Sequence, residues 1–303
     1  MFDVVVIGGS YAGLSAALQL GRARKKVLVV DGGQRRNRTA AHAHGFLGRD
    51  GESPARIAED ARRDVRAYPT VAFRDGHAEH ARAIGSGFEV QVGGEWIATR
   101  RILLAMGVVD TLPAIEGLAE RWGHTVAHCP YCHGYELDRG RLGVLATPTL
   151  PHHLPILISE WSEPGGTTLF LQGTELAADA LAALDARKIR LEKSAVVRIE
   201  GPTAAPGKGI ALVLADGRKT ELAGLFVPPK THIPGTLVDE LGCALAEGPM
   251  GPYVKVDDMK VTSVPGVFAC GDLAMAAGTV ALAVADGARA GASVHQSLVF
   301  RPA

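Results

Sequence analysis

Residues 2–31 read FDVVVIGGSYAGLSAALQLGRARKKVLVVD, and this stretch decides the fold. The apolar run Phe2–Ile7 is typical of a strand that is buried on both faces. Leu14–Arg24 has the apolar spacing of a helix, and Lys26–Asp31 is a second apolar run that ends in a carboxylate. A strand, a glycine-rich turn, a helix and a second strand predict a parallel βαβ unit of the dinucleotide-binding type.

The glycines of this turn have the spacing that a bound dinucleotide requires. Gly8 permits the tight turn, Gly9 lets a pyrophosphate approach the backbone, and Gly13 lets the helix pack against the strand. Amide groups at the helix N-terminus would then face the phosphates, and the carboxylate of Asp31 would accept hydrogen bonds from a ribose. A glycine turn without a ligand is the alternative. The other residues that we expect to line the cofactor here are Ser10, Tyr11, Ala12 and Gly32.

The rest of the chain predicts a second domain inserted into the first. A buried strand at Arg101–Gly107 is followed by Pro113 and Gly117, and Pro228-Pro229 marks the return. We therefore expect an α/β fold with two Rossmann-like dinucleotide-binding domains in three layers (ββα). The first domain would comprise residues 1–114 and 230–303, and residues 115–229 would form a degenerate NAD(P)-binding-like domain.

Composition narrows the class of protein. Hydrophobic residues make up 47% and charged residues 21% of the 303 residues, and 32 basic side chains balance 32 acidic ones. This balance gives no electrostatic reason to expect binding to nucleic acid or to an anionic membrane. The apolar N-terminus is too short to span a bilayer and lacks the pattern of a signal peptide, so we expect a cytoplasmic protein.

The C-terminal segment distinguishes between dinucleotides. Residues 270–291, CGDLAMAAGTVALAVADGARAG, resemble the second FAD motif of flavoproteins with two dinucleotide-binding domains. The resemblance implies that Asp272, after Gly271, binds the ribityl chain. It also implies that the helix beginning at Val280 and Ala281 directs its N-terminus at the flavin pyrimidine, where its positive end would favour the anionic reduced ring. The cofactor that we expect is FAD.

Between the two flavin motifs lies HCPYCHGYE, residues 128–136. The CxxC spacing of Cys129 and Cys132 allows a small disulfide ring, and such motifs commonly lower the pKa of one thiol. Zinc ligation by His128, the two cysteines and His133 is an alternative, although no second pair of ligands at a familiar spacing completes a metal site. A purely structural role of the cysteines is a further alternative.

Taken together, GGSYAG, DGGQ, the central CxxC and VFACGD resemble the low-molecular-weight thioredoxin reductase family over nearly the whole chain. The resemblance implies that Cys132 is the sulfur next to the flavin, that Cys129 exchanges with substrate, and that the protein is a homodimer. The acid/base position after the second cysteine is His133, and an imidazole can serve there near neutral pH; a structural histidine is the alternative. Three polar residues of the segment QRRNRTAAHAHGF would approach the cofactor or remain in solvent: Asn37, His42 and His44.

The chain departs from that family at the expected NADPH site. In VLATPTLPHHLP, residues 144–155, Ala146, Thr147 and Pro148 occupy the positions of the second glycine-rich turn. Side chains there would crowd a pyrophosphate, and proline removes an amide donor. The following stretch QGTELAADALAAL, residues 172–184, contains no arginine for a 2′-phosphate. We therefore expect that NADPH binding is lost.

With these departures the chain is similar to the FAD-dependent dithiol oxidases of gliotoxin and holomycin type. The resemblance implies that electrons pass from a small-molecule or protein dithiol through Cys129 and Cys132 to FAD and then to oxygen. One alternative is a thioredoxin-reductase-like disulfide reductase supplied by NADPH or by another donor such as ferredoxin. A non-enzymatic flavin redox sensor is the other. The sequence predicts an enzyme, a FAD-dependent thiol-disulfide oxidoreductase.

Overall fold

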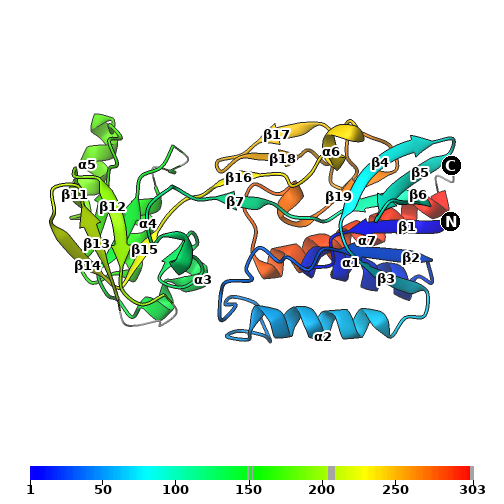
Figure 1. Ribbon diagram of the computed structural model, residues 1–303, viewed down its shortest axis with the longest axis horizontal. Helices are drawn as coiled ribbons and strands as arrows, with labels where there is room; N and C mark the ends of the chain where they lie inside the picture. Colours follow the sequence, from blue (N-terminus) through cyan, green and yellow to red (C-terminus); the bar gives the residue numbers. More distant parts are fainter. Residues whose placement is uncertain (149, 152, 204–208, 301–303) are drawn as a thin grey trace. The chain divides into compact units, whose positions relative to one another are not determined.

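The computed structural model describes residues 1–148, 150–151, 153–203 and 209–300. The chain divides into two compact units, and each is described by itself (Figure 1). Unit 1 comprises residues 1–36, 45–109 and 231–303, and unit 2 comprises residues 37–44 and 110–230. The short segment 37–44 therefore belongs to unit 2, although the residues on both sides of it in the sequence belong to unit 1.

A seven-stranded sheet forms the centre of unit 1. Its order is β3-β2-β1-β6-β5-β4, and β19 pairs with the C-terminal part of β6. The strands β3, β2, β1, β6 and β19 are parallel, whereas β4, β5 and the N-terminal part of β6 form an antiparallel meander. The strand bounds are β1 Phe2–Ile7, β2 Val27–Asp31, β3 Val71–Asp75, β4 Ala78–Ile84, β5 Gly87–Val92, β6 Glu95–Leu104 and β19 Val267–Ala269.

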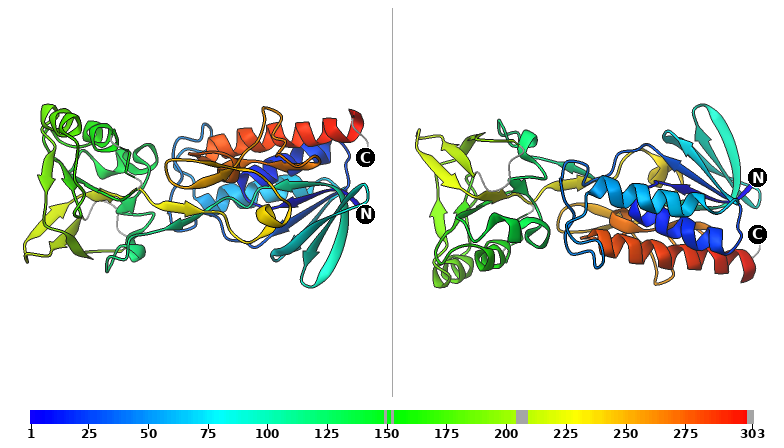
Figure 2. Two further views of the ribbon diagram at one scale, coloured as in Figure 1. Left: turned by 90° about the horizontal axis from the view of Figure 1, so that it is seen from above. Right: turned by 90° about the horizontal axis from the view of Figure 1, so that it is seen from below.

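The two faces of the parallel strands are covered by different layers. The helices α1 (Tyr11–Arg22), α2 (Pro54–Arg66) and α7 (Val280–Phe300) lie on one face (Figure 2). On the other face, side chains such as Ile7 and Leu104 share a buried cluster with Phe88 and Val90 of the meander and with Leu237 of the short helix α6 (Leu237–Glu240). Strand residues are therefore apolar on both sides, as expected for a central parallel sheet.

Helices α1 and α7 approach closely because small residues face each other. A Cβ on Gly287 would overlap the backbone of Ala12, and a Cβ on Gly291 would come 2.6 Å from the carbonyl oxygen of Ala16. The hydroxyl of Ser15 donates to the carbonyl of Val284 at 2.7 Å. This packing joins the first and last helices of the chain, so the two ends of the sequence build one unit.

Two further pairs of short strands lie in unit 1 or at its sequence boundaries with unit 2. β17 (Leu245–Glu247) and β18 (Pro252–Val254) form an antiparallel pair. β7 (Val109–Thr111) and β16 (Lys230–His232) form a two-stranded sheet at the two long-range crossings of the chain between the units.

Unit 2 combines a five-stranded parallel sheet with a three-stranded antiparallel one. The parallel sheet has the order β11-β10-β9-β15-β8, and its strands are β8 Val126–Ala127, β9 Leu142–Leu145, β10 Thr167–Phe170, β11 Arg190–Glu192 and β15 Gly224–Phe226. The antiparallel sheet consists of β12 Val196–Glu200, β13 Ile210–Leu214 and β14 Lys219–Leu222. The helices are α3 Pro130–His133, α4 Leu154–Ile158 and α5 Ala178–Ala186.

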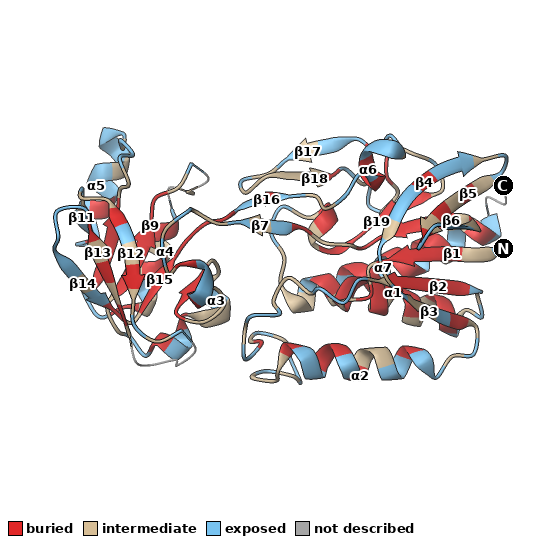
Figure 3. Cartoon of the chain, in the orientation of Figure 1, coloured by how far each residue is buried: buried red, intermediate tan, exposed pale blue. Residues whose placement is uncertain are grey.

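The parallel sheet of unit 2 has two apolar faces. Phe170 and Leu145 pack against Leu212 of the antiparallel sheet, whereas Phe226 and Val144 pack in a cluster that contains Ile158 of α4. Figure 3 shows these central strands as almost continuously buried. The fold prediction of two Rossmann-like α/β units, the second inserted in the first, is confirmed. Within the described residues no helix is both long and apolar enough to cross a membrane.

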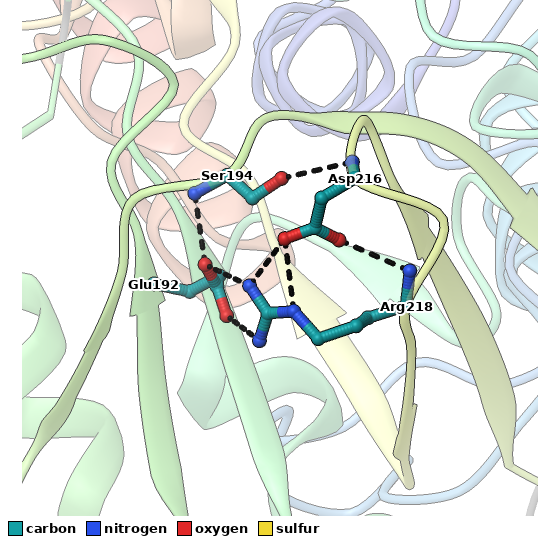
Figure 4. A network of polar contacts seen from close by, with 4 residues as sticks. All are labelled: Glu192, Ser194, Asp216 and Arg218. Atoms are coloured by element: carbon teal, nitrogen blue, oxygen red, sulfur yellow. Dashed lines mark hydrogen bonds and ion pairs between the residues drawn. The ribbon is translucent and has the colours of Figure 1, made fainter.

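A surface network fastens the β13–β14 turn to the end of β11 (Figure 4). The guanidinium of Arg218 donates to both carboxylate oxygens of Glu192 at 2.8 and 3.0 Å, and to Asp216 at 2.6 and 2.8 Å. These hydrogen bonds from Arg218 lower the pKa of Glu192 and of Asp216. Ser194 joins the network by donating its backbone amide to Glu192.

Candidate functional site

The first glycine motif has the geometry of a phosphate-binding turn. β1 ends at Ile7, Gly8 adopts φ +107°, and α1 begins at Tyr11. A Cβ on Gly8 would overlap the carbonyl of Ala105, so only glycine fits this position. Ser10 is the N-cap of α1, but its side chain makes no capping hydrogen bond. The amides of the first helical turn therefore lack that intramolecular acceptor, as an anion-binding helix end requires.

Asp31 lies at the C-terminal end of β2, directly beside this turn. A Cβ on Gly9 would come 2.7 Å from the Asp31 carboxylate carbon, so the bare backbone at Gly9 leaves space for that side chain. One Asp31 oxygen accepts from the Gly33 amide at 3.2 Å, and the other pairs with Nη1 of Arg62 at 3.0 Å. Each carboxylate oxygen can accept more than one hydrogen bond, so Asp31 retains capacity for ribose hydroxyls.

Arg62 is a residue of this region that sequence reasoning missed. It extends from α2, pairs with Asp31 and with Asp75 (2.7 Å), and places its guanidinium 4.7 Å from the centre of the Phe73 ring. The helix α2 has no glycine motif, and its charged residues resemble an ordinary solvated face. Only the pairing of β2 with β3 brings Asp31, Asp75 and Phe73 together beneath it.

The second flavin motif reaches the same end of the sheet. After β19, Gly271 adopts φ +71°, and a Cβ on it would come 2.8 Å from the Cβ of Ala12 in the first motif. Asp272 pairs with Nη1 of Arg36 at 2.8 Å. Val280 and Ala281, both half-buried, open α7. The two motifs, far apart in the sequence, thus meet at the carboxyl ends of parallel strands, where α/β proteins bind ligands.

The CxxC pair lies in unit 2, after β8. Cys129 is the N-cap of the short helix α3, Pro130 is its first residue, and the Cys132 amide donates to the Cys129 carbonyl at 3.2 Å. This turn brings the two sulfurs within 2.7 Å of each other, and both cysteines are half-buried. The local backbone therefore holds the sulfurs in reach of a disulfide.

Aromatic residues support the helix that carries the cysteines. Tyr131, between the cysteines, meets Trp161 edge-on with 5.1 Å between ring centres. A Cβ on Gly134 would come 2.7 Å from Cδ1 of the Trp161 indole, so Trp161 packs directly against the backbone that follows Cys132. This contact could not be predicted from the sequence, because Trp161 lies 25 positions after Glu136, the last residue of the motif.

His133 is half-buried and directly follows Cys132. Its Nε2 lies 3.3 Å from the carbonyl oxygen of Gly123, and because a carbonyl only accepts, Nε2 carries the proton of the neutral ring. Its Nδ1 is buried and has no hydrogen-bond partner among the described residues. Burial lowers the pKa of His133, an effect opposed by the Gly123 carbonyl and the negative charge of Glu136. The imidazole is therefore neutral near pH 7, with Nδ1 as its basic atom.

His44 and Asn37 belong to the unit that carries the cysteines. His44 Nε2 lies 3.4 Å from Oε1 of Glu136, three residues after His133. The same segment packs against Gly123, where a Cβ would come 3.0 Å from the Ala40 amide nitrogen. The structure therefore links His44 to the redox motif, while the predicted contact of His44 and Asn37 with the cofactor stays a prediction.

In the turn expected to hold NADPH, the described residues do not lead directly from the strand into a helix. β9 ends at Leu145, and α4 begins only at Leu154 with Pro155 in its first turn. Thr147 donates its hydroxyl to the Pro228 carbonyl at 3.1 Å, and Ala146 is buried. Positions 149 and 152 of the predicted turn lie outside the described residues.

After β10, where a 2′-phosphate would bind, Gln172 is engaged elsewhere. Its side-chain oxygen accepts from the Val196 amide at 2.6 Å, and its side-chain nitrogen lies 3.3 Å from the Val196 carbonyl. These contacts tie the end of β10 to β12.

The other two cysteines are buried in unit 1. Cys270 is fully buried and Cys243 nearly so. Burial raises the pKa of both thiols, which makes them poor nucleophiles. The described part of the chain holds no group of three or more histidine, cysteine or acidic side chains arranged to bind a metal.

Comparison with known proteins gives a consistent picture. The pyridine nucleotide-disulphide oxidoreductase family matches residues 2–145. Thioredoxin reductase sirT from Leptosphaeria maculans is 32% identical over 97% of this chain and 94% of its own length. The crystal structure of an oxidoreductase from Agrobacterium tumefaciens has a TM-score of 0.92 and 50% identity, and covers 99% of both chains. The structure of HlmI has a TM-score of 0.90 and 35% identity, and covers 98% of this chain and 92% of that chain.

The cofactor follows from the family and agrees with the residues present. Thioredoxin-reductase-like members are FAD-dependent, and FAD is the cofactor of this chain. The uncapped start of α1, the glycine positions that admit no Cβ and the meeting of the Ala12 and Gly271 motifs fit such a dinucleotide. The chain belongs to the thioredoxin-reductase-like flavoproteins of the pyridine nucleotide-disulphide oxidoreductase family, and it is an oxidoreductase that acts on thiols and disulfides.

Proposed function

We propose that this chain is an FAD-dependent dithiol oxidase, which closes a disulfide in a dithiol substrate and uses oxygen as the final electron acceptor. The observation that carries the proposal is a contrast within one molecule. The first glycine turn leads directly into α1 with an uncapped helix end, whereas the turn after β9 carries side chains and a proline, and its helix begins late. The first arrangement favours a dinucleotide, and the second disfavours one.

In this proposal the residues of the two glycine motifs hold FAD. The amides at the start of α1 bind the pyrophosphate, Asp31 accepts from the adenosine ribose, and Asp272 accepts from the ribityl chain. Val280 and Ala281 present the positive end of α7 to the flavin ring. FAD, when bound, supplies the two-electron acceptor that returns Cys129 and Cys132 to the disulfide and passes those electrons to oxygen, which yields hydrogen peroxide.

The chain's own sulfurs carry out the exchange. A substrate thiolate attacks Cys129 of the enzyme disulfide, so that a substrate–Cys129 bond forms and the bond to Cys132 breaks, with its electron pair left on Cys132. The second substrate thiolate then attacks the substrate sulfur bound to Cys129. The substrate disulfide closes, and Cys129 leaves as a thiolate. The sum is the oxidation of one dithiol and the reduction of the Cys129–Cys132 disulfide to two thiols.

His133 serves as the acid/base of these exchanges. Its Nε2 hydrogen is held by the Gly123 carbonyl, which leaves Nδ1 as the atom that takes the proton from an entering thiol. A thiol attacks only as its thiolate, so a neutral imidazole near the dithiol speeds the exchange around neutral pH. Burial favours this neutral form.

Oxygen uptake by the purified protein tests the proposal. With dithiothreitol as the dithiol, we expect oxygen consumption matched by hydrogen peroxide, and no consumption with NADPH alone. Cys129→Ser is the matched control, since it keeps the flavin motifs and removes the attacked sulfur. Rapid NADPH oxidation together with no response to dithiols would refute the oxidase.

The second candidate is a disulfide reductase, and the printed name of several relatives, thioredoxin reductase, favours it. Such a reductase would take electrons from NADPH bound in another way or from a reduced protein such as ferredoxin. It would reduce a disulfide without consuming oxygen in proportion. In either case we expect a cytoplasmic homodimer, which size-exclusion chromatography with light scattering would test.

A further inference from the structure

We propose that Lys260 and Asp286 form a charge-balanced positioning pair for the second flavin motif. Lys260 Nζ lies 2.5 Å from Oδ1 of Asp286, with 13% and 9% of the two side chains exposed. Lys260 lies outside both flavin motifs and the redox motif, whereas Asp286 lies in α7, within the second flavin motif but six residues after Val280. The inference rests on FAD as cofactor but not on the direction of electron flow, so it stands apart from the proposed oxidase activity.

Asp286 connects the pair to the cofactor motif. Its second oxygen, Oδ2, accepts the backbone amide of Gly271 at 2.9 Å in a buried setting. Gly271 has φ +71° and directly precedes Asp272. A charge-assisted hydrogen bond to a main-chain amide is among the stronger ones in proteins. Asp286 therefore fixes the turn from which Asp272 extends.

The backbone of Lys260 is hydrogen-bonded to β19, the strand that leads to Gly271. Its carbonyl accepts from the Ala269 amide at 3.1 Å, its own amide donates to Asp257, and its φ of +62° is unusual for a residue with a side chain. The loop therefore accepts a strained backbone conformation at Lys260. This position brings the ammonium group to Asp286.

A buried carboxylate without a partner carries a large desolvation cost, and breaking one half of a buried pair is strongly destabilising. An apolar residue could have packed beneath Gly271 at lower cost. The pair instead gives Gly271 an ionised acceptor while leaving the local net charge at zero. The charge balance matters here because reduced flavin is anionic, so an unbalanced charge near its motif would change the reduction potential.

Removing the charge of Lys260 and removing the charge of Asp286 should shift the reduction potential of bound FAD in opposite directions. Lys260→Gln leaves the carboxylate unbalanced, so the reduction potential of bound FAD should become more negative. Asp286→Asn leaves the ammonium unbalanced, so the potential should become more positive. We expect each change to correspond to at least a threefold change in the ratio of the dissociation constants of oxidised and reduced FAD. The double variant should return close to the wild-type potential.

The experiment is a redox titration of the bound flavin with a reference dye, together with FAD dissociation measured by fluorescence. Asp3→Asn is the matched control, because Asp3 pairs with Arg100 at the amino end of β1, opposite the flavin motifs. The reduction potential of FAD bound to this variant should equal that of the wild type. Lys260→Arg keeps the positive charge, so the reduction potential of its bound FAD should equal that of the wild type. This variant is the one to measure if Lys260→Gln fails to retain FAD. Shifts of the same sign in the two single variants, or no shift in either, would overturn the proposal.

Discussion

Oε1 of Glu136 lies 3.4 Å from Nε2 of His44, and Glu136 follows the half-buried His133 by three residues. This contact joins the segment 37–44 to the redox motif within one unit. His133 is also held by the carbonyl of Gly123, against which the same segment packs. The histidine that we expect to act as the acid/base is thus surrounded by groups from three parts of the sequence.

Glu136→Gln tests whether this carboxylate acts on His133. The negative charge of Glu136 raises the pKa of His133. Its removal should therefore lower that pKa and move the acid limb of kcat/KM for dithiol oxidation to lower pH, by less than about one unit for a partly exposed charge. An unchanged or upward-shifted limb would show that Glu136 does not act on the histidine.

His133→Asn should lower turnover with dithiols by about a hundredfold, the usual scale for loss of a general acid/base. In the wild type, burial holds the pKa of His133 below its usual 6.5. The neutral, active form should therefore persist below pH 6.5, and activity should fall only at more acidic pH. The exposed His153 offers a control, since His153→Gln should leave the profile unchanged. Loss of the acid limb in His153→Gln, or its retention in His133→Asn, would contradict the assignment.

Thiol labelling distinguishes the cysteines. Cys243 and Cys270 are buried and have raised pKa values, so neither should react quickly in the folded protein. With 5,5′-dithiobis(2-nitrobenzoic acid), we expect Cys132→Ser to form a lasting mixed disulfide at Cys129, because the sulfur that would displace it is missing. The double variant of Cys129 and Cys132 should show no fast labelling. Equal fast labelling in the double variant would mean that another thiol is exchange-competent.

The lowered pKa of Glu240 makes the stability of unit 1 depend on pH in the acid range. It accepts hydrogen bonds from the hydroxyl of Thr236 and the amide of Ala81, and lies 2.8 Å from Nδ1 of His80. These contacts, led by Thr236, lower the pKa of Glu240 to about 2. The folded-state pKa is depressed, so the stabilisation is present above pH 4.5 and is lost as the pH falls toward 2.

Glu240→Gln should therefore lower the free energy of unfolding at pH 7 by about 1 kcal/mol or less, since the group is largely solvated. The difference from wild type should shrink as the pH approaches 3. Urea denaturation at the two pH values measures both quantities. A difference that grows at acid pH would have the wrong sign for this carboxylate.

Local patterns were enough to predict the βαβ unit at the start of the chain and the insertion of a second domain. The helix α1 begins at Tyr11 rather than at Leu14, because Gly13 packs within the helix against the Gly8 carbonyl, a close approach that apolar spacing does not reveal. Both motifs of the flavin site can be recognised from the amino-acid sequence alone. Their meeting at Ala12 and Gly271 agrees with that prediction.

The partners of these motifs could not be predicted in the same way. Arg36, Arg62 and Lys260 reach their carboxylates from segments without a motif, and each contact depends on which strands become neighbours. The membership of residues 37–44 in the second unit was equally hidden, because the sequence on both sides of that segment belongs to the first. Such contacts are set by tertiary packing and have no periodic signal.

In the proposed oxidase, electrons enter from a dithiol and not from NADPH. Anaerobic titration of the purified flavoprotein, followed at the flavin absorbance band, measures which donor reduces the flavin. We expect bleaching by a stoichiometric dithiol and no rapid bleaching by stoichiometric NADPH. Rapid bleaching by NADPH with no response to the dithiol would show that the protein is not a dithiol oxidase.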